Sequence, residues 1–350
     1  MLCLVSPEQF VPLEHPIRVL KPRVDELLRE LSPRFDQMYA QVGRPSVPPE
    51  HLLKAMVLIA LFSVRSERQF CEQLGYNLLF RWFLDMDMTD RPFDATVFSH
   101  NRDRLMDYEV AAMFLQGTVG LAEELGLMSD EHFSVDGSLI EAWASMKSFR
   151  PKDDNDGDNN GFADFKGTKR SNDTHESKTD PEAKLFRKGR GKEAKLAYMA
   201  HVLMENRNAL VADFTLTEAN GTAERDAGLK LAKRAKERRR PKGRTTLAAD
   251  KNYDTRAFVA SCRAARITPH VAQFQHAHRS SAIDGRTTRH RGYHVSQTAR
   301  LLIEKIFGWM KTVAGFRRSR YRGRRKTAFA GTIVMATYNL LRISKLLPAA

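Results

Sequence analysis

The sequence of 350 residues is poor in cysteine and in long apolar runs. Its cysteines, Cys3, Cys71 and Cys262, lie far apart, so they form neither a disulfide framework nor the closely spaced pairs of a zinc site. The most apolar stretch near the C-terminus, residues 329–341, is too short to cross a bilayer and is followed by Arg342. The N-terminus has no basic segment followed by an apolar one. We therefore expect no secretion signal and a cytoplasmic protein.

Acidic residues are also scarce relative to basic ones. The chain has 57 lysines and arginines against 42 aspartates and glutamates, a formal net charge of +15. This surplus favours a polyanionic partner, and nucleic acid ranks ahead of a membrane surface because no long uncharged apolar run exists. The densest basic run lies in residues 315–326, where two aromatic residues are interleaved and no acid occurs. We expect its seven cations to follow a phosphate backbone: Arg317, Arg318, Arg320, Arg322, Arg324, Arg325 and Lys326.

The first third of the chain is predicted to be entirely helical, as a domain over residues 1–128. Four arginines lie near the predicted helix starts: Arg65, Arg68, Arg102 and Arg104. Short helices joined by tight turns, with arginines in these places, are compatible with a helix-turn-helix that reads DNA. A helical scaffold with ordinary surface arginines accounts for the same pattern equally well.

Local signals predict where two of these helices begin. Ser66, followed three residues later by Gln69, has the form of a capping box. Thr96 is the expected cap of a later helix.

Residues 129–350 mix strand and helix patterns. Strands are predicted at residues 132–140, 195–204, 209–216, 245–249 and 267–271, and helices at residues 224–240 and 256–265. The order of strand, hairpin, helix, strand, helix, strand and helix predicts a mixed α/β sheet flanked by helices. Residues 150–193 are rich in Asp, Asn, Gly and Lys, and we expect a polar, disordered or ligand-ordered insertion there.

Residues 297–313 predict a helix with two different faces. At about 100° per residue, one stripe is polar or small: Gln297, Arg300, Glu304, Gly308 and Lys311. The opposite stripe is apolar and is expected to be buried: Leu302, Ile306, Trp309, Met310 and Val313. A solvated face carrying an Arg300–Glu304 ion pair is the commoner explanation of such spacing. The basic run that follows favours a metal-binding carboxylate beside a phosphate track.

Two further carboxylates end predicted strands. Asp136 precedes a glycine, and Asp250 follows an apolar strand. Either could simply mark a turn. Together with Glu304 they form a set of carboxylates without cysteine, which suits a hard cation such as Mg²⁺ or Mn²⁺. Two such ions about 4 Å apart would stabilise the attacking and leaving oxygens of phosphodiester chemistry.

The sequence resembles the DDE transposases of bacterial insertion sequences, in the group related to the fourth and fifth insertion-sequence families. The resemblance lies in Val135-Asp-Gly-Ser-Leu-Ile-Glu-Ala-Trp-Ala-Ser145, Ala249-Asp-Lys-Asn-Tyr-Asp254 and Ile303-Glu-Lys-Ile-Phe-Gly-Trp-Met-Lys311. In related families the third segment reads Tyr, two residues, Arg, three residues, Glu, six residues, Lys. Arg300, Glu304 and Lys311 match this pattern, whereas Gln297 takes the place of the tyrosine.

The resemblance implies a ribonuclease-H-like catalytic domain over residues 129–350, with Asp136, Asp250 and Glu304 as its metal-binding triad. It implies two Mg²⁺ or Mn²⁺ ions, cleavage at the element ends, and attack of the freed 3′-OH on target DNA. Gln297, Arg300 and Lys311 are expected to contact the double-stranded DNA. Pairing of two ends implies a homodimer or a higher oligomer, located at the bacterial nucleoid.

Two other functions fit the same residues. A ribonuclease-H-like nuclease that cuts without joining would use the same triad. A DNA-binding protein descended from a transposase would need no catalysis, although a broken triad would be expected in that case.

Overall fold

The computed structural model describes residues 5–38, 46–152, 170–187, 189, 191–239, 243–274 and 280–347. The chain forms two compact units. The first holds Met1–Ser129, Gly308–Gly315 and Thr332–Ala350, and the second holds Asp130–Phe307 and Phe316–Gly331. The first boundary falls next to the predicted one at residue 128. Since later segments return to the first unit, the domain ranges assigned from sequence stay a prediction.

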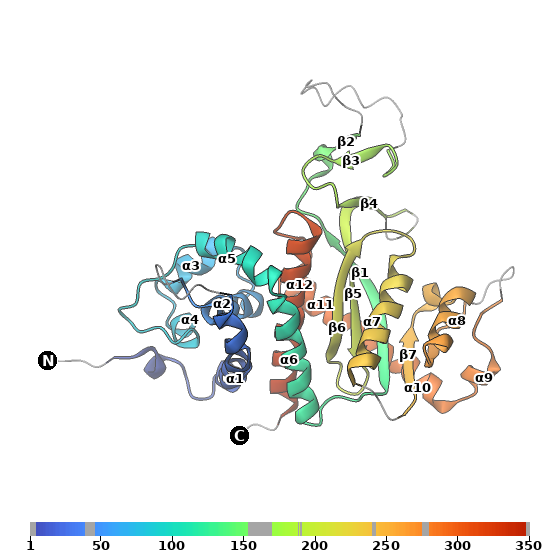
Figure 1. Ribbon diagram of the computed structural model, residues 1–350, viewed down its shortest axis with the longest axis horizontal. Helices are drawn as coiled ribbons and strands as arrows, with labels where there is room; N and C mark the ends of the chain where they lie inside the picture. The colour runs from blue at the N-terminus through green and yellow to red at the C-terminus, as the bar shows by residue number, and fades with distance from the viewer. Residues whose placement is uncertain are drawn as a thin grey trace. The chain divides into compact units, whose positions relative to one another are not determined.

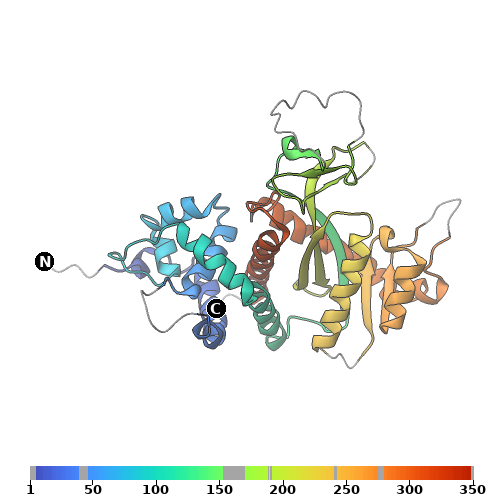
Figure 2. The same cartoon turned by 45° about the horizontal axis from the view of Figure 1, so that its top comes forward.

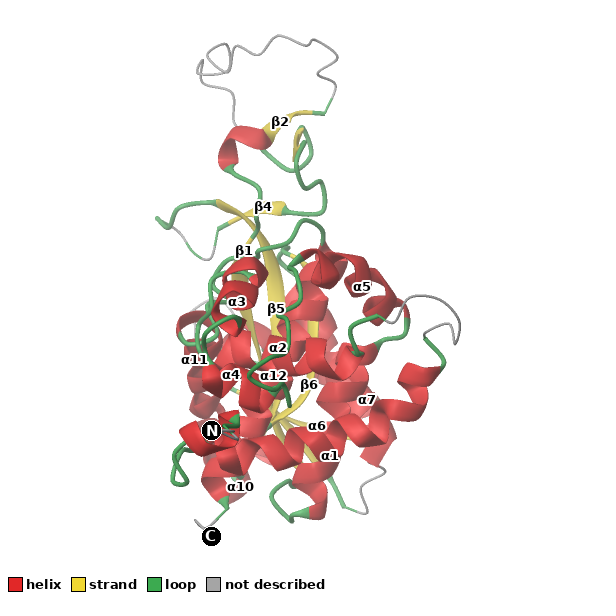
Figure 3. Cartoon of the chain, turned by 90° about the vertical axis from the view of Figure 1, so that its left-hand side faces the viewer, coloured by secondary structure: helices red, strands yellow, loops and turns green. Residues whose placement is uncertain are grey.

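The N-terminal part of the first unit is helical. Figure 3 draws it as helices joined by loops, and the described residues of 5–129 contain no strand. A short 3-10 helix η1 (Pro7–Phe10) precedes α1 (Ile17–Asp36), α2 (Pro49–Leu61), α3 (Glu67–Leu74), α4 (Leu78–Phe83), α5 (Thr96–Asp107) and α6 (Val110–Glu124). Helix α1 buries Leu20, Val24, Leu27 and Leu28 at helical spacing, which stabilises it against neighbouring helices. The prediction of an all-helical N-terminal region is confirmed.

The two predicted caps have different outcomes. The Ser66 hydroxyl accepts a hydrogen bond from the Gln69 backbone N–H at 3.1 Å, as a capping box requires. The Gln69 side chain reaches one residue further back and accepts from the Arg65 N–H at 3.0 Å. Thr96 is not a cap, because its own N–H donates to Asp94 Oδ1 at 2.8 Å. The Asp94 carboxylate accepts the free N–H at the start of the helix, so the prediction that Thr96 is the cap was wrong.

The second unit is built on a six-stranded mixed sheet (Figures 1 and 2). Strands β1 (His132–Glu141), β5 (Lys195–Glu205) and β6 (Val211–Glu218) are successively antiparallel, and β4 (Lys184–Phe186) pairs with the start of β5. Strands β7 (Thr245–Ala249) and β8 (Ile267–Val271) extend the other edge of β1 in parallel. An antiparallel trio followed by two parallel strands is the ribonuclease-H-like arrangement that the resemblance implied.

Helices cover the sheet. Helix α7 (Ala223–Arg239) packs along β1, β5 and β6, and α8 (Arg256–Ala264) packs on β8. Helix α10 (Arg291–Ala299), which follows the single turn α9 (Gly285–Thr288), crosses β1, β7 and β8.

Side-chain alternation along the strands separates the α7 face from the α10 face. Val135 faces α7, because its Cγ1 would lie 3.3 Å from a Cβ at Gly228. His270 faces α10, where its Nδ1 lies 2.8 Å from the Ser296 hydroxyl. The register pairs Ser134 with Ala248 and Ala248 with His270, so these three positions share the α10 face.

The polar region predicted to be an insertion is partly folded. Strand β2 (Phe149–Pro151), preceded by the 3-10 turn η2 (Met146–Ser148), pairs with β3 (His175–Ser177), and the rings of Phe149 and His175 stack at 5.5 Å. Buried Asp180 accepts from the Tyr198 hydroxyl at 2.6 Å and from the Gly323 N–H at 3.2 Å. Disorder therefore does not describe residues 170–187, since a few well-placed contacts order a sequence poor in apolar residues. Residues 153–169 lie outside the described residues.

The predicted helix over residues 297–313 is interrupted. Helix α10 ends at Ala299, a 3-10 turn η5 (Arg300–Leu302) follows, and α11 (Ile303–Thr312) continues. The buried side chains of α11 are Ile303, Ile306, Phe307 and Met310. Ile306 and Met310 are buried as predicted. The 3-10 turn changes the angular phase, so Ile303 and Phe307 join the buried face, whereas Leu302 and Trp309 are half-buried. Val313 lies beyond the end of α11 and is 37% exposed instead of buried. The last helix is α12 (Arg324–Leu346). None of the helices in the described part of the chain meets the length and hydropathy needed to cross a membrane.

Candidate active site

Asp136 lies within β1, and Asp250 directly follows the neighbouring strand β7. Strands β1 and β7 pair His132 with Thr246 and end their pairing at Ser134 and Ala248. The same register, continued two residues further, sets Asp136 opposite Asp250. Strand β1 continues past Asp136 to Glu141, so the prediction that a strand ends at Asp136 was wrong, and only Asp250 directly follows a strand. Adjacent strands run about 4.8 Å apart, so residues separated by more than a hundred positions in sequence become neighbours in the sheet.

The backbone around each aspartate fixes its carboxylate. Asp136 Oδ1 accepts from the Gly137 N–H at 2.8 Å, and Asp250 Oδ1 accepts from the Asn252 N–H at 2.9 Å. The second bond caps the 3-10 turn η4 (Lys251–Tyr253). Asp136 lies two residues after Ser134 on β1. Because alternate residues of a strand point to the same face, its side chain belongs to the α10 face of the sheet.

Glu304 follows on the helix beyond α10. It is exposed in the first turn of α11. The preceding helix is tied to β8, because the Gln297 amide donates to the His270 carbonyl and the Tyr293 hydroxyl donates to the Val271 carbonyl at 3.1 Å. Gln297, at the position of the family tyrosine, thus holds α10 on the sheet. Arg300 Nε donates to Gln297 Oε1 at 3.4 Å, so its recorded partner is Gln297 instead of Glu304.

The three acids are not gathered at ligand distance. Across the described ranges, no group of three His, Cys, Asp or Glu side chains is close enough to hold a metal ion. The structure brings Asp136 and Asp250 to one level and places Glu304 on the element that follows the helix over that face. Oxygen-only donors of this kind suit Mg²⁺ or Mn²⁺.

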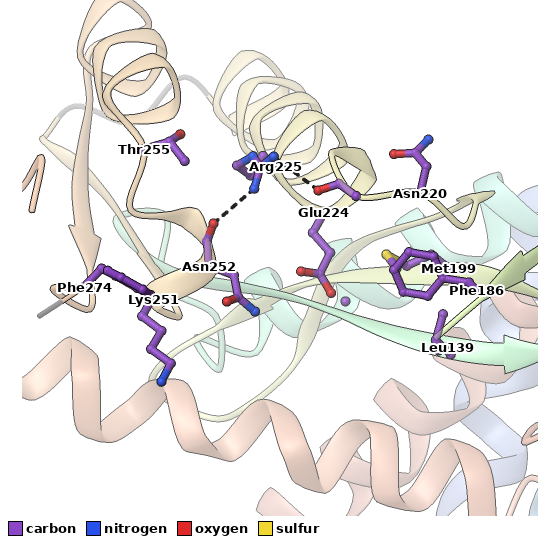
Figure 4. A pocket seen from close by; sticks show the side chains of 12 residues that line it. Leu139, Phe186, Met199, Asn220, Glu224, Arg225, Lys251, Asn252, Thr255 and Phe274 are labelled. Carbon is purple, nitrogen blue, oxygen red and sulfur yellow. Dashed lines mark hydrogen bonds between the residues drawn. The ribbon is translucent and has the colours of Figure 1, made fainter. Parts of the chain in front are cut away.

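A pocket of about 350 Å³ opens beside Gly137 (Figure 4). Its wall includes Glu224 from the first turn of α7, together with Lys251 and Asn252 from the turn after Asp250. The Arg225 guanidinium donates to the Asn252 carbonyl at 3.3 Å and joins the two segments. The reading of the sequence missed Glu224. An acid in a first helical turn is the only signal it gives, and that signal is common.

Tyr253 is a second residue that the sequence did not reveal. It is fully buried, and its hydroxyl is without a hydrogen-bond partner among the described residues. Burial raises the pKa of Tyr253 well above its usual value, and the nearby charges of Asp136, Glu224 and Asp250 raise it further. The phenol is therefore neutral at physiological pH and lies close enough to these three carboxylates to feel their charge.

Part of the basic run is bound to the chain itself. Its backbone pairs with the last residue of β1, where the Glu141 N–H donates to the Arg317 carbonyl at 3.0 Å. The Arg318 guanidinium donates to the carbonyls of Ala142 at 3.0 Å and Trp143 at 2.7 Å. These bonds hold the run in a defined conformation.

The remaining members of the run differ in exposure. Arg324 forms an ion pair with Glu182 at 3.3 Å. The other exposed members are Arg317, Arg322 and Arg325, whereas Arg320 and Lys326 are half-buried. Lys311, near the end of α11, is also half-buried.

The four N-terminal arginines do not form one surface set. Arg65 and Arg68 are exposed at the start of α3. Arg102 is buried, with 7% exposure, and donates to Glu67 Oε2 at 2.6 Å. The guanidinium stabilises the packing of α5 against α3, and the contact of Arg102 with DNA stays a prediction. Arg104 is exposed and donates to Asn101 Oδ1 at 3.3 Å.

Two family models match the chain. Residues 5–104 match the family described as "Transposase domain (DUF772)", and residues 164–340 match "Transposase DDE domain". The second match spans more than half of the chain, so the chain belongs to the DDE transposase family. It is a transposase, and the resemblance stated from the sequence is confirmed.

Similar solved structures are distant. The piggyBac transposase synaptic complex with hairpin DNA is 10% identical, with a TM-score of 0.45, over 97% of this chain and 77% of that one. The Mos1 transposase paired-end complex with the left transposon end is 14% identical, with a TM-score of 0.21, over 66% of this chain and 61% of that one. Scores this low add nothing to the assignment. A search of curated proteins finds no match for this chain.

Proposed function

We propose that this transposase binds the ends of its insertion sequence and catalyses metal-dependent strand cleavage and strand transfer at Asp136, Asp250 and Glu304. The observation that carries the proposal is the parallel register of β1 and β7, which pairs Ser134 with Ala248 and, continued two residues further, sets Asp136 opposite Asp250. A ribonuclease-H-like sheet with one acid within β1, one directly after β7 and a third on the helix after α10 supports phosphodiester chemistry.

Each protein group has a distinct task in this reaction. The three carboxylates would hold two Mg²⁺ or Mn²⁺ ions, which supply Lewis acidity to the attacking and leaving oxygens when bound. The backbone bonds to Asp136 and Asp250 orient these carboxylates before DNA arrives. Arg300 and Lys311 would neutralise phosphate oxygens beside the scissile bond.

The basic run would hold the DNA. Its exposed arginines include Arg317, where the backbone is bonded to β1, Arg322 in the following loop, and Arg325 in the first turn of α12. A track of cations with no acid between them matches the regular charge of a phosphate backbone. Pairing of two element ends requires a homodimer or a higher oligomer during the reaction.

The test uses purified protein, labelled duplexes that carry the element's own ends, and Mg²⁺ or Mn²⁺. Cleavage and joining by the wild type, lost in Asp136→Asn, Asp250→Asn and Glu304→Gln, is the expected result. Glu237→Gln, at an exposed position near the end of α7, is the matched control and should keep activity. Binding without cutting by the wild type would favour the DNA-binding descendant, and cutting without joining would favour the nuclease.

A further inference from the structure

A second cavity, of about 580 Å³, opens at the N-terminal ends of β7 and β8. Arg244 precedes the first residue of β7, and Arg266 precedes the first residue of β8. Lys236, from the last turn of α7, and Arg263, from the last turn of α8, complete the cationic wall. Four cations from four different segments thus surround one cavity, which the hydroxyl-bearing Thr268 also lines.

Neutralisation of helix ends explains only part of this charge. Lys236 is bound within the fold, because its Nζ donates to the carbonyls of Ala265 at 2.8 Å and Arg266 at 2.9 Å. Helices α7 and α8 both end here, and each C-terminus contributes about half a negative charge. The four positive charges exceed the combined negative charge of the two helix ends by roughly three.

Among the described residues, the acids Glu131 and Asp284 lie near the cavity. The Glu131 carboxylate lies against Gly243, which lines the cavity, and it removes one positive charge from the balance. Asp284 is bound by the Arg286 guanidinium at 2.7 Å, so that pair is neutral by itself. A surplus of about two charges remains, since the two helix ends together contribute only about one negative charge. Its exposed carriers are Arg244, Arg263 and Arg266.

The cavity lies at the opposite end of the parallel strands from the candidate active site. Arg244 and Asp250 flank the two ends of β7. The chain takes six residue steps from Arg244 to Asp250, and at about 3.3 Å per step these span roughly 20 Å. One phosphate group cannot reach both places, whereas a duplex advances 20 Å in about six base pairs, with a charge every ~1.7 Å of its axis.

We propose that the cavity bounded by Lys236, Arg244, Arg263 and Arg266 binds backbone phosphates of duplex DNA, at a place separate from the site of strand cleavage. The proposal rests on the proposed function only in taking DNA as the ligand. Three exposed guanidiniums around a hollow suit the tetrahedral oxygens of phosphodiesters. Because the contact is to backbone, it is independent of base sequence.

The experiment measures binding of a fluorescent duplex without divalent metal, over a series of salt concentrations. Arg263→Gln with Arg266→Gln removes two cations and leaves Lys236 in place. The slope of log K against log salt is negative, and each lost phosphate contact makes it shallower by about 0.9. The double variant should therefore have a slope shallower than that of wild type by nearly two. Affinity at about 0.15 M salt should fall at least tenfold.

The matched control is Lys230→Gln with Lys233→Gln, which removes the same charge from exposed positions on α7 that do not line the cavity. This pair should change the slope by less than half a unit. Equal slopes for both double variants, or a slope unchanged from wild type in the arginine variant, would overturn the proposal. Circular dichroism and thermal unfolding confirm that both proteins are folded.

Failure of the active-site proposal has a different signature. Asp136→Asn should keep the wild-type salt slope whether or not the carboxylates are catalytic. In Mn²⁺, the double arginine variant should need a higher DNA concentration than wild type for half-maximal cleavage of element ends, and its rate at saturating DNA reports whether the arginines act in the cleavage step. A rate reduced more than tenfold at saturation would place these arginines in the catalytic step and contradict a separate binding site.

Discussion

The carboxylate of Glu224 lies directly over the α-carbon of Gly137. A Cβ at Gly137 would lie 2.8 Å from Glu224 Cγ and 2.9 Å from its Oε1. Since Gly137 follows Asp136, this contact links the first turn of α7 to the strand that carries a proposed metal ligand. The glycine is needed here for close approach and not for an unusual backbone conformation.

Gly137→Ala should therefore destabilise the fold. The Glu224 side chain is half-buried and can move, so the cost should lie at the low end of that for overpacking, about 1 kcal/mol, and urea unfolding measures it. Glu224→Ala in the same chain should recover most of the loss, because it removes the atoms that the new methyl group meets. Equal losses in the single and double variants would show that the two residues do not interact.

Tyr253→Phe removes a buried hydroxyl without a recorded partner. An unpaired buried polar group costs about 1–3 kcal/mol, so the variant should unfold at the same temperature as wild type or at a higher one. Differential scanning calorimetry makes the comparison. Phe258→Leu, which disturbs the ring packed against Tyr253 at 5.2 Å and keeps the hydroxyl, serves as a contrast and should lower the melting temperature. A clear loss of stability in Tyr253→Phe would mean that the hydroxyl has a partner.

Two buried histidines predict a dependence of stability on pH. Burial lowers the pKa of His201 to about 4 and the pKa of His270 to about 4. Below pH 6.5 the unfolded chain binds protons that the folded chain resists, so stability is complete above pH 6.5 and falls as the pH drops toward 4. At pH 5 each histidine contributes a loss on the order of 2 kcal/mol. Urea unfolding of wild type and His201→Gln should show a smaller loss in the variant, and an equal loss would contradict the assignment.

Arg102 should matter for stability and not for DNA. Arg102→Ala leaves Glu67 in a mostly buried site without this guanidinium, at a cost of about 3 kcal/mol. The salt dependence of DNA binding by the folded variant should equal that of wild type. Arg68→Ala, at an exposed position on the same pair of helices, is the control and should leave the unfolding free energy nearly unchanged. A reduced salt slope in Arg102→Ala would support the predicted DNA contact.

The strands and the level of the two aspartates were accessible from the sequence for a physical reason. Alternation and short apolar runs predicted β1, β5, β6, β7 and β8 almost to the residue. Asp136 and Asp250 stood out as acids on or directly after such runs. The expectation that the first strand ends at Asp136 was wrong, because β1 continues to Glu141. Their roles in catalysis stay a prediction, as does that of Glu304.

What the sequence could not predict depends on packing between distant segments. Glu224 lies near Asp136 only because α7 crosses β1, and Tyr253 lies near it because η4 follows β7, the neighbour of β1. No local pattern in the sequence records either arrangement. Nothing in the sequence indicates that Arg102 is buried, because its partner Glu67 lies 35 residues away in the chain. The 3-10 turn η5 changed the faces of the helix that carries Glu304, because a periodicity argument assumes an unbroken helix.

The most direct test of the central claim is a switch of metal preference. Asp136→Cys and Asp250→Cys exchange a hard oxygen ligand for a softer sulfur, which Mg²⁺ binds poorly and Mn²⁺ tolerates better. If these side chains hold the metal, each variant should lose end cleavage in Mg²⁺, by at least a hundredfold, and regain a substantial part of it in Mn²⁺. Wild-type cleavage in both metals and the inactive Asp136→Ala and Asp250→Ala are the references. Equal activity of the cysteine variants in the two metals, at any level above the alanine variants, would contradict metal binding by these aspartates.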